Sequence, residues 1–217
     1  MSFPPIIDIP FDHRHCCWFC NEPSNDLFVY YRVKHTPHPS MQLPACSECK
    51  RFANKHLLTS IWDCRAAVKD ELAKKYHKHL AIGHNWTEQE LKDSEFSCKA
   101  LEGFKKSAWM MFTIAKERMN FQGWSISINQ QLLDNQDSYN LQRFEFDGIE
   151  FPSLTKAIEH YAKTLHISEH FLRQLVTILG KQGFSKAVKL ARLNIGVTNT
   201  MQQKIIQELI AEQDNLE

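Results

Sequence analysis

The sequence predicts an α+β fold that is mainly helical. Two Cys-x-x-Cys pairs, Cys17/Cys20 and Cys46/Cys49, enclose a stretch with the character of a β-hairpin. Two long segments with helical periodicity follow, and then a second hairpin leads into several short, capped helices. We therefore expect a metal-binding domain over residues 1–60, a helical connector over 61–122, and a hairpin-plus-helix domain over 123–217.

The composition is that of a folded protein with balanced charge. The 217 residues are 43% hydrophobic and include 14 Phe, which is enough to form a core and argues against global disorder. Lys and Arg number 26 and Asp and Glu 25, so the formal net charge is +1. Any basic surface for a polyanion must therefore be local.

The sequence predicts a cytoplasmic protein without a membrane partner. Residues 1–10 lack the cationic start and apolar core of a signal peptide. The longest apolar run, at 108–115, is far shorter than the roughly 20 residues of a membrane span. Seven cysteines, four of them at metal-ligand spacing, suit a reducing compartment better than a disulfide framework.

The segment from the first cysteine pair to residue 58 predicts a zinc knuckle, a β-hairpin and a helix, in this order. Asn21 ends the first cysteine pair and tolerates left-handed backbone. Residues 27–33 are rich in aromatic and β-branched side chains, 35–40 form a turn, and 41–43 return the chain. A helix over 45–58 opens at the second cysteine pair, where its dipole favours thiolates. This is the element order of a treble-clef zinc finger.

The two cysteine pairs predict one tetrahedral Zn²⁺ site with Cys17, Cys20, Cys46 and Cys49 as ligands. Four thiolates leave no open coordination position, so we expect the ion to be structural. Cys16 in place of Cys17 would leave three residues between the ligands of the first pair.

Cap signatures place the connector helices. Ser60 with Asp63 opens the first, and Thr87 with Glu90 forms a capping box for the second, which reaches about residue 120 with a break near Ser94.

The last part begins at a change of composition near Gly123. Residues 124–128 alternate apolar and polar side chains, and 130–140 form a polar loop. Residues 144–151 read as a hairpin with Asp147-Gly148 at its turn. Four helices then follow, opened by Ser153, by Ser168, by Ser185, and by Thr200 with Gln203.

Residues 15–58 resemble the zinc-containing HNH endonucleases, which combine a CxxC knuckle, a hairpin and a CxxC-opened helix. The resemblance implies a ββα-metal scaffold. This chain has Tyr30-Tyr31-Arg32 where the family has its Asp-His pair, and Lys50 where it has Asn or His. An active nuclease would bind Mg²⁺ or Mn²⁺ and use other imidazoles, and the nearby candidates are His35, His38 and His56. We favour loop or surface roles for these histidines.

Residues 144–190 resemble the small helix-turn-helix modules of phage and intron homing endonucleases. The matching positions are Asp147-Gly148, Ser153, Ala157, Ile167-Ser168 and the segment 183–187. The resemblance implies a second helix that enters the major groove of DNA. Its outward face would carry His170, Arg173, Gln174 and Thr177, of which Arg and Gln suit guanine and adenine edges.

We expect a zinc-containing nucleic-acid-binding protein, with DNA as the partner. The predicted contact residues are Lys50, Arg51, Lys55, Lys74, Lys75, Arg173 and Gln174. One alternative is a metal-dependent DNA endonuclease with a diverged centre, although we favour binding over catalysis. The other is a zinc-braced protein-interaction module, favoured by the aromatic strand with Phe28, Tyr30 and Tyr31.

Overall fold

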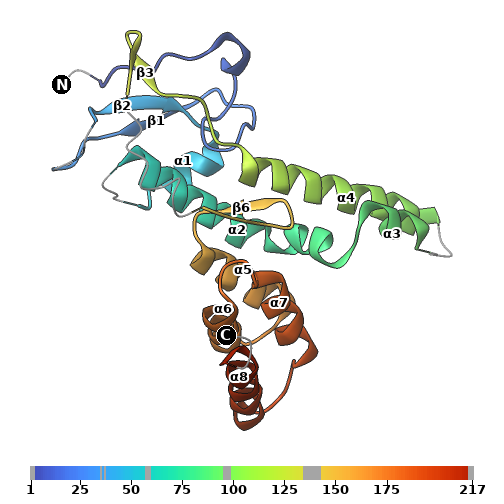
Figure 1. The fold of residues 1–217 in the computed structure, drawn as a ribbon. Helices are drawn as coiled ribbons and strands as arrows, with labels where there is room; N and C mark the ends of the chain where they lie inside the picture. The colour runs from blue at the N-terminus through green and yellow to red at the C-terminus, as the bar shows by residue number, and fades with distance from the viewer. Residues whose placement is uncertain are drawn as a thin grey trace. The chain divides into compact units, whose positions relative to one another are not determined.

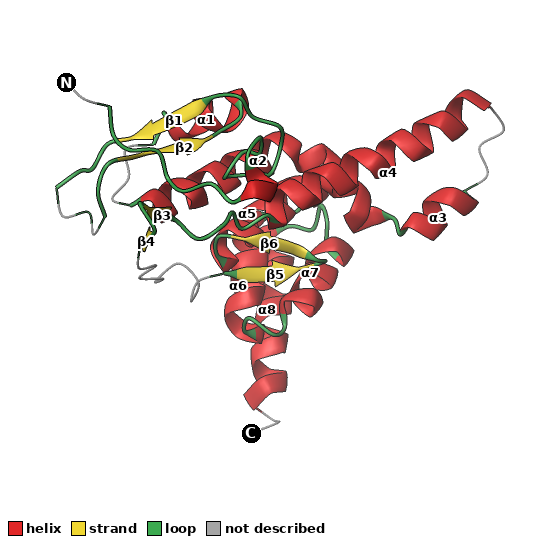
Figure 2. Ribbon diagram, turned by 90° about the horizontal axis from the view of Figure 1, so that it is seen from above, coloured by secondary structure: helices red, strands yellow, loops and turns green. Residues whose placement is uncertain are grey.

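The computed structural model describes residues 3–34, 36, 38–56, 60–94, 99–133 and 143–214. The fold is α+β and mainly helical, as the sequence predicts (Figures 1 and 2). The chain forms two compact units, residues 1–152 and 153–217. In the described residues, no helix is both long enough and apolar enough to cross a membrane.

The first unit begins with a two-stranded antiparallel sheet and a short helix. Strand β1 (Leu27–Tyr30) pairs with β2 (Met41–Pro44), with Leu27 opposite Pro44 and Tyr30 opposite Met41. Alternate side chains of β1 face inward, which is the pattern of a half-buried strand. Helix α1 (Ser47–Ala53) follows β2 directly and packs against the sheet and against α2 (Figure 1).

Two long helices, α2 (Ile61–Asn85) and α4 (Lys99–Asn120), lie side by side and form the scaffold of this unit (Figures 1 and 2). Helix α3 (Glu88–Asp93) lies between them in the chain. The predicted caps are confirmed. The Ser60 hydroxyl accepts the Asp63 N–H at 3.0 Å, and Thr87 with Glu90 forms a capping box. The predicted break near Ser94 is also confirmed, because α3 ends at Asp93.

A close crossing brings α2 and α4 together. A Cβ atom at Gly83 would lie 2.1 Å from the Phe112 ring, so only a glycine allows this packing. Glycine often follows the end of a helix, but α2 continues two residues beyond Gly83, to Asn85.

The two remaining hairpins also belong to the first unit. Strands β3 (Ser127–Ile128) and β4 (Gln131–Leu132) turn through residues that the sequence assigns partly to a loop. Strands β5 (Phe144–Phe146) and β6 (Ile149–Phe151) form the predicted hairpin, with positive φ at Asp147 and Gly148. The Asn120 side chain fixes this hairpin, donating to the Gly148 carbonyl at 2.7 Å and accepting from the Glu150 N–H at 3.0 Å.

The second unit consists of four helices: α5 (Leu154–Leu165), α6 (Glu169–Leu179), α7 (Phe184–Leu193) and α8 (Asn199–Asp214). Ser153 and Ser168 cap α5 and α6 as predicted, each accepting a backbone N–H at 3.3 Å. Phe171, Leu172 and Phe184 are fully buried at its centre.

The contacts divide the chain differently from the three segments expected from the sequence. The hairpin at 144–151 packs on α4, α4 packs on α2, and α2 packs on α1, so the hairpin and the connector helices belong to the same compact unit as the cysteine pairs. The boundary falls between Pro152 and Ser153, at the start of the capped helices.

Candidate metal centre and nucleic-acid surfaces

The first cysteine pair is held in a tight loop. Asn21 has φ +64°, the left-handed conformation that we predicted for it, and its N–H donates to the Cys17 carbonyl at 2.9 Å. The Cys17 N–H donates to the Glu22 carbonyl at 2.8 Å. The Trp18 N–H donates to the Pro44 carbonyl at 2.9 Å, which fixes this loop against the end of β2.

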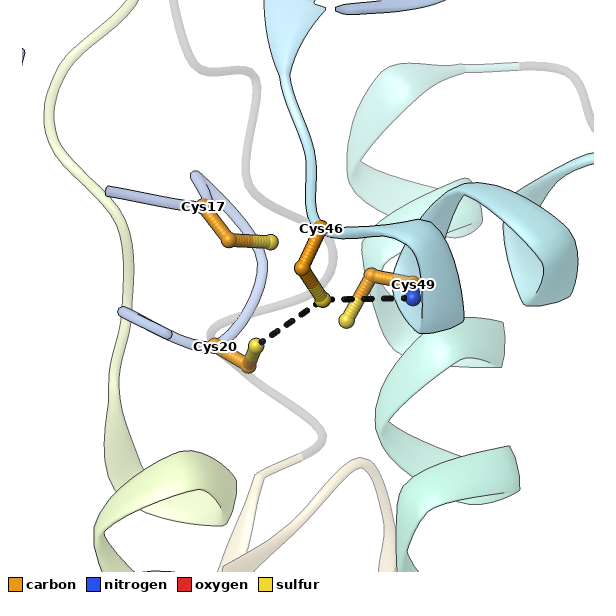
Figure 3. A group of neighbouring side chains, drawn as sticks. All are labelled: Cys17, Cys20, Cys46 and Cys49. Atoms are coloured by element: carbon orange, nitrogen blue, oxygen red, sulfur yellow. Dashed lines mark hydrogen bonds between the residues drawn. The ribbon is translucent and has the colours of Figure 1, made fainter. Parts of the chain in front are cut away.

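The second pair opens α1. Cys46 is the N-cap residue, and its Sγ accepts the Cys49 N–H at 3.4 Å. A thiolate at this position faces the free N–H groups and the positive end of the helix dipole. The helix start thus orients Cys46 and Cys49 toward the same point (Figure 3).

The sulfur atoms of Cys17, Cys20, Cys46 and Cys49 all lie within 4.8 Å of one another, and three of these residues are buried (Figure 3). Cys20 Sγ and Cys46 Sγ are 3.8 Å apart, too far for a disulfide. Four thiolates at about 2.3 Å from a central zinc ion would be separated by about 3.8 Å. The cluster could hold a metal such as zinc. Cys16, the alternative to Cys17, is not part of it.

The thiols of the cluster influence one another's protonation. Hydrogen bonding with the Cys17 thiol lowers the pKa of Cys20 to about 7, and the Arg118 guanidinium contributes in the same direction. Hydrogen bonding with Cys17 and Cys20 also lowers the pKa of Cys46, whereas the pKa of Cys49 is raised. Two of the four groups thus favour the thiolate form that metal binding requires.

A buried arginine from the far end of α4 reaches the cluster. Arg118 Nη2 lies 3.6 Å from Cys20 Sγ and donates to Glu48 Oε2 at 2.6 Å. Arg118 Nη1 donates to the Tyr76 hydroxyl at 2.7 Å. Burial raises the pKa of Glu48, but hydrogen bonds from Lys75, Arg118 and Tyr76 outweigh it and lower that pKa below its ordinary value. These hydrogen bonds connect α1, α2 and α4 next to Cys20.

A second buried cation lies nearby on α2. Lys69 is 4% exposed, and its ammonium donates to the Arg118 carbonyl. Burial lowers the pKa of Lys69 to about 7, while the charge of Cys20 acts in the opposite direction. A zinc ion with four thiolates carries a net charge of −2, so two buried cations would compensate it. The sequence did not reveal the roles of Arg118 and Lys69. Both are basic residues in helices, and only their tertiary contacts distinguish them from the exposed ones.

The candidate catalytic histidines are not assembled into a centre in the described residues. Both ring nitrogens of His38 are used: Nδ1 donates to the Pro39 carbonyl at 3.1 Å and Nε2 accepts the Ile61 N–H at 2.9 Å. The ring is buried, and burial lowers the pKa of His38. The Nε2 of His56 is buried and has no hydrogen-bond partner among the described residues. His35 lies outside the described residues.

Most of the predicted phosphate-binding residues of the first unit are already ion-paired. Arg51 is exposed, and its guanidinium lies 5.4 Å from the centroid of the Phe52 ring. The four lysines pair with carboxylates: Lys50 with Asp26, Lys55 with Glu71, Lys74 with Asp70, and Lys75 with Glu48. Each lysine would have to exchange its carboxylate for a phosphate.

In the second unit, the predicted reading face of α6 points away from the core. His170 and Thr177 are exposed, Arg173 and Gln174 are partly exposed, and the buried residues lie on the opposite side of the helix. The Arg173 guanidinium donates to Glu169 Oε1 at 2.7 Å, in an i,i+4 pair at the surface.

The aromatic strand offers little free surface. Phe28 and Tyr30 are buried in the core, and Tyr31, just after β1, is exposed. This alternation leaves a single aromatic side chain of the three for a protein partner. The aromatic strand therefore supports the protein-interaction alternative less strongly than the sequence suggested.

Comparison of this chain with protein-family models, with curated proteins and with solved structures found no match.

Proposed function

We propose that this protein is a zinc-braced nucleic-acid-binding protein, in which Cys17, Cys20, Cys46 and Cys49 bind one structural Zn²⁺ ion. The convergence of four thiols within 4.8 Å supports the proposal most strongly. The spacing of the pairs, the left-handed Asn21 and the helix start at Cys46 fit a zinc knuckle followed by a treble-clef helix.

The surroundings of the four thiols fit zinc in charge as well as in geometry. Arg118 and Lys69 would balance the excess negative charge of a tetrathiolate site. The ion would hold the knuckle against α1, and no step of chemistry is assigned to it, because four sulfur ligands would leave no position for water or substrate.

Binding of nucleic acid, with DNA as the preferred partner, rests on the second unit. The helices α5 and α6 follow each other through a short turn, and α6 presents the polar face described above. This arrangement is compatible with a helix-turn-helix-like module whose Arg173 and Gln174 contact base edges. The first unit would add contacts from Arg51 and from lysines that release their carboxylates.

The metal part of the proposal is tested by elemental analysis of the purified chain. We expect one zinc per chain, and loss of helical circular dichroism when a strong chelator removes it, because metal binding and folding are linked at such sites. A Cys17→Ser variant is expected to lose zinc and stability, whereas Cys16→Ser, whose thiol lies outside the cluster, serves as the matched control. Full zinc content in Cys17→Ser would refute this ligand set.

The nucleic-acid part is tested by fluorescence anisotropy with a labelled DNA duplex across a salt series. Affinity that falls steeply with salt is expected for phosphate contacts. Absence of binding at low salt would rule out this function and leave the protein-interaction alternative. Cleavage of the duplex in Mg²⁺ or Mn²⁺ that is lost in His56→Ala would instead support the nuclease alternative.

A further inference from the structure

A long segment of the second unit is basic and free of acidic residues. Between His170 and Gln207 the chain has six Lys or Arg and no Asp or Glu. The whole chain has 26 basic and 25 acidic side chains, so the other residues have 20 basic and 25 acidic ones. The net charge of the whole chain is therefore the sum of +6 in this segment and −5 in the other residues.

Three of these cations form one face of α7. Phe184, Ala187, Val188 and Ala191 are buried, whereas Lys186, Lys189 and Arg192 are exposed. At 100° per residue the three exposed positions span an arc of about 120°, and they extend over about 9 Å along the helix axis. We call Lys186, Lys189 and Arg192 the α7 basic face.

The α7 basic face differs from the lysines of the first unit in its surroundings. Among the described residues, none of its three side chains forms an ion pair with a carboxylate, whereas Lys50, Lys55, Lys74 and Lys75 all do. Cations without a carboxylate partner can contact phosphates without first breaking an ion pair. Their binding releases counterions from the nucleic acid, which favours association.

The α7 basic face suits a phosphate backbone better than a membrane. A helix that lies on a membrane inserts its apolar side into the lipid, and the apolar side of α7 is buried in the core of the unit. The exposed side of α7 carries the three cations, and Leu193 at the end of the helix is its one exposed large apolar side chain among the described residues. A row of long, flexible cations without aromatic anchors matches the evenly charged backbone of a duplex.

We propose that the α7 basic face is the main phosphate-contact surface of the protein, and that it positions the unit on the backbone of double-stranded DNA. The proposal rests on the nucleic-acid-binding function proposed above and assigns that function to residues outside the predicted contact set. In this arrangement the first unit makes a minor contribution to the electrostatic part of binding.

The test is the salt dependence of duplex binding by three forms of the full chain, measured by fluorescence anisotropy. The forms are the wild type, the triple variant Lys186→Gln/Lys189→Gln/Arg192→Gln, and the control variant Lys34→Gln/Lys92→Gln/Lys106→Gln. Both variants remove three positive charges from exposed positions, so they change the total charge equally. Circular dichroism melts check that the α7 variant remains folded.

We expect the α7 variant to reduce the slope of log affinity against log salt by about 2.7, because each lost phosphate contact contributes about 0.9. With equal affinities at 1 M salt, this slope change corresponds to a loss of affinity of about 500-fold at 0.1 M salt. The control variant is expected to keep most of the wild-type slope.

The possible failures are distinguishable. If the wild type binds the duplex and the α7 variant retains its slope, the assignment to α7 is wrong but the function stands. If the wild type does not bind the duplex at low salt, both the assignment to α7 and the proposed nucleic-acid-binding function are refuted. Binding of anionic lipid vesicles that depends on the same three residues, without binding of DNA, would overturn the proposal in favour of a membrane surface.

Discussion

Single residues in this protein have roles that their type alone does not disclose. His38 belongs to the candidate catalytic set by sequence, yet in the structure it accepts the first N–H of α2 and donates to the Pro39 carbonyl. It is therefore a buried neutral side chain that caps a helix. Arg118 is one of many helical basic residues by sequence, but it contacts Cys20 and Glu48 in the interior.

The pH dependence of stability tests the role of His38. Burial lowers its pKa below the ordinary 6.5, so the unfolded chain binds a proton at a pH where the folded protein does not. The contribution of His38 is complete above about pH 6.5 and is lost as the pH falls through the lowered pKa of the folded state. Denaturant unfolding at several pH values should show His38→Gln to be less stable at pH 7.5 by about 1–3 kcal/mol.

The difference between wild type and His38→Gln should shrink toward pH 5, because only the wild type loses this contribution on acidification. A difference that stays constant with pH would contradict a neutral, capping His38.

Substitution of Arg118 tests whether the buried network supports the metal centre. Arg118→Met removes the contact to Cys20 and one of the hydrogen bonds to Glu48, which keeps Lys75 and Tyr76 as partners, so a loss of about 1–3 kcal/mol is expected. Zinc release to a chromogenic chelator should also be faster in Arg118→Met than in Arg118→Lys, which retains the charge. Equal release rates in the wild type and both variants would mean that Arg118 does not act on the centre.

The elements were more predictable than their contacts. Caps such as Ser60, the capping box at Thr87 and the Asp147-Gly148 turn were identified correctly, because each depends on hydrogen bonds between residues close in sequence. The convergence of the four cysteines joins residues 26 positions apart, yet it was predictable, because two Cys-x-x-Cys pairs in one chain are a recognisable metal-ligand pattern. The ion pairs of Lys50 and Lys75 join residues more than 20 positions apart and had no such signal.

At the level of elements, the crossing of α2 and α4 depends on Gly83. In Gly83→Ala the new Cβ would lie 2.1 Å from the Phe112 ring, so the helices must separate or the ring must move. We expect a loss of about 1–3 kcal/mol, as for overpacking in other cores. The matched control is Gly103→Ala in α4, where a Cβ meets nothing within 4 Å.

Gly103→Ala is expected to be neutral or to stabilise the helix by up to about 1 kcal/mol, because alanine favours helix more than glycine. Thermal or urea unfolding of the two variants measures the contrast. Equal stabilities would show that α2 and α4 do not cross at Gly83 as described.

In the whole molecule, the four-cysteine cluster and the α7 basic face belong to different compact units. All four cysteines lie in residues 1–152, so a bound ion would brace that unit, and the second unit has its own buried centre. Metal loading and the folding of α5–α8 should therefore be separable.

Hydrogen exchange of the full chain tests this separation. After chelation we expect amide protection to fall across α1, α2 and α4, because the knuckle and α1 lose the ion that joins them. Protection in α5 and α6 should change little. Simultaneous loss of protection in both units would show that they unfold as one cooperative body.

X-ray absorption at the zinc edge of the purified protein is the most direct measurement of whether Cys17, Cys20, Cys46 and Cys49 surround one zinc ion. A site formed by these four cysteines predicts four sulfur atoms at about 2.3 Å from the zinc and no nitrogen or oxygen ligand. A shell that includes nitrogen or oxygen at about 2.0–2.1 Å, or the absence of bound zinc, would contradict it.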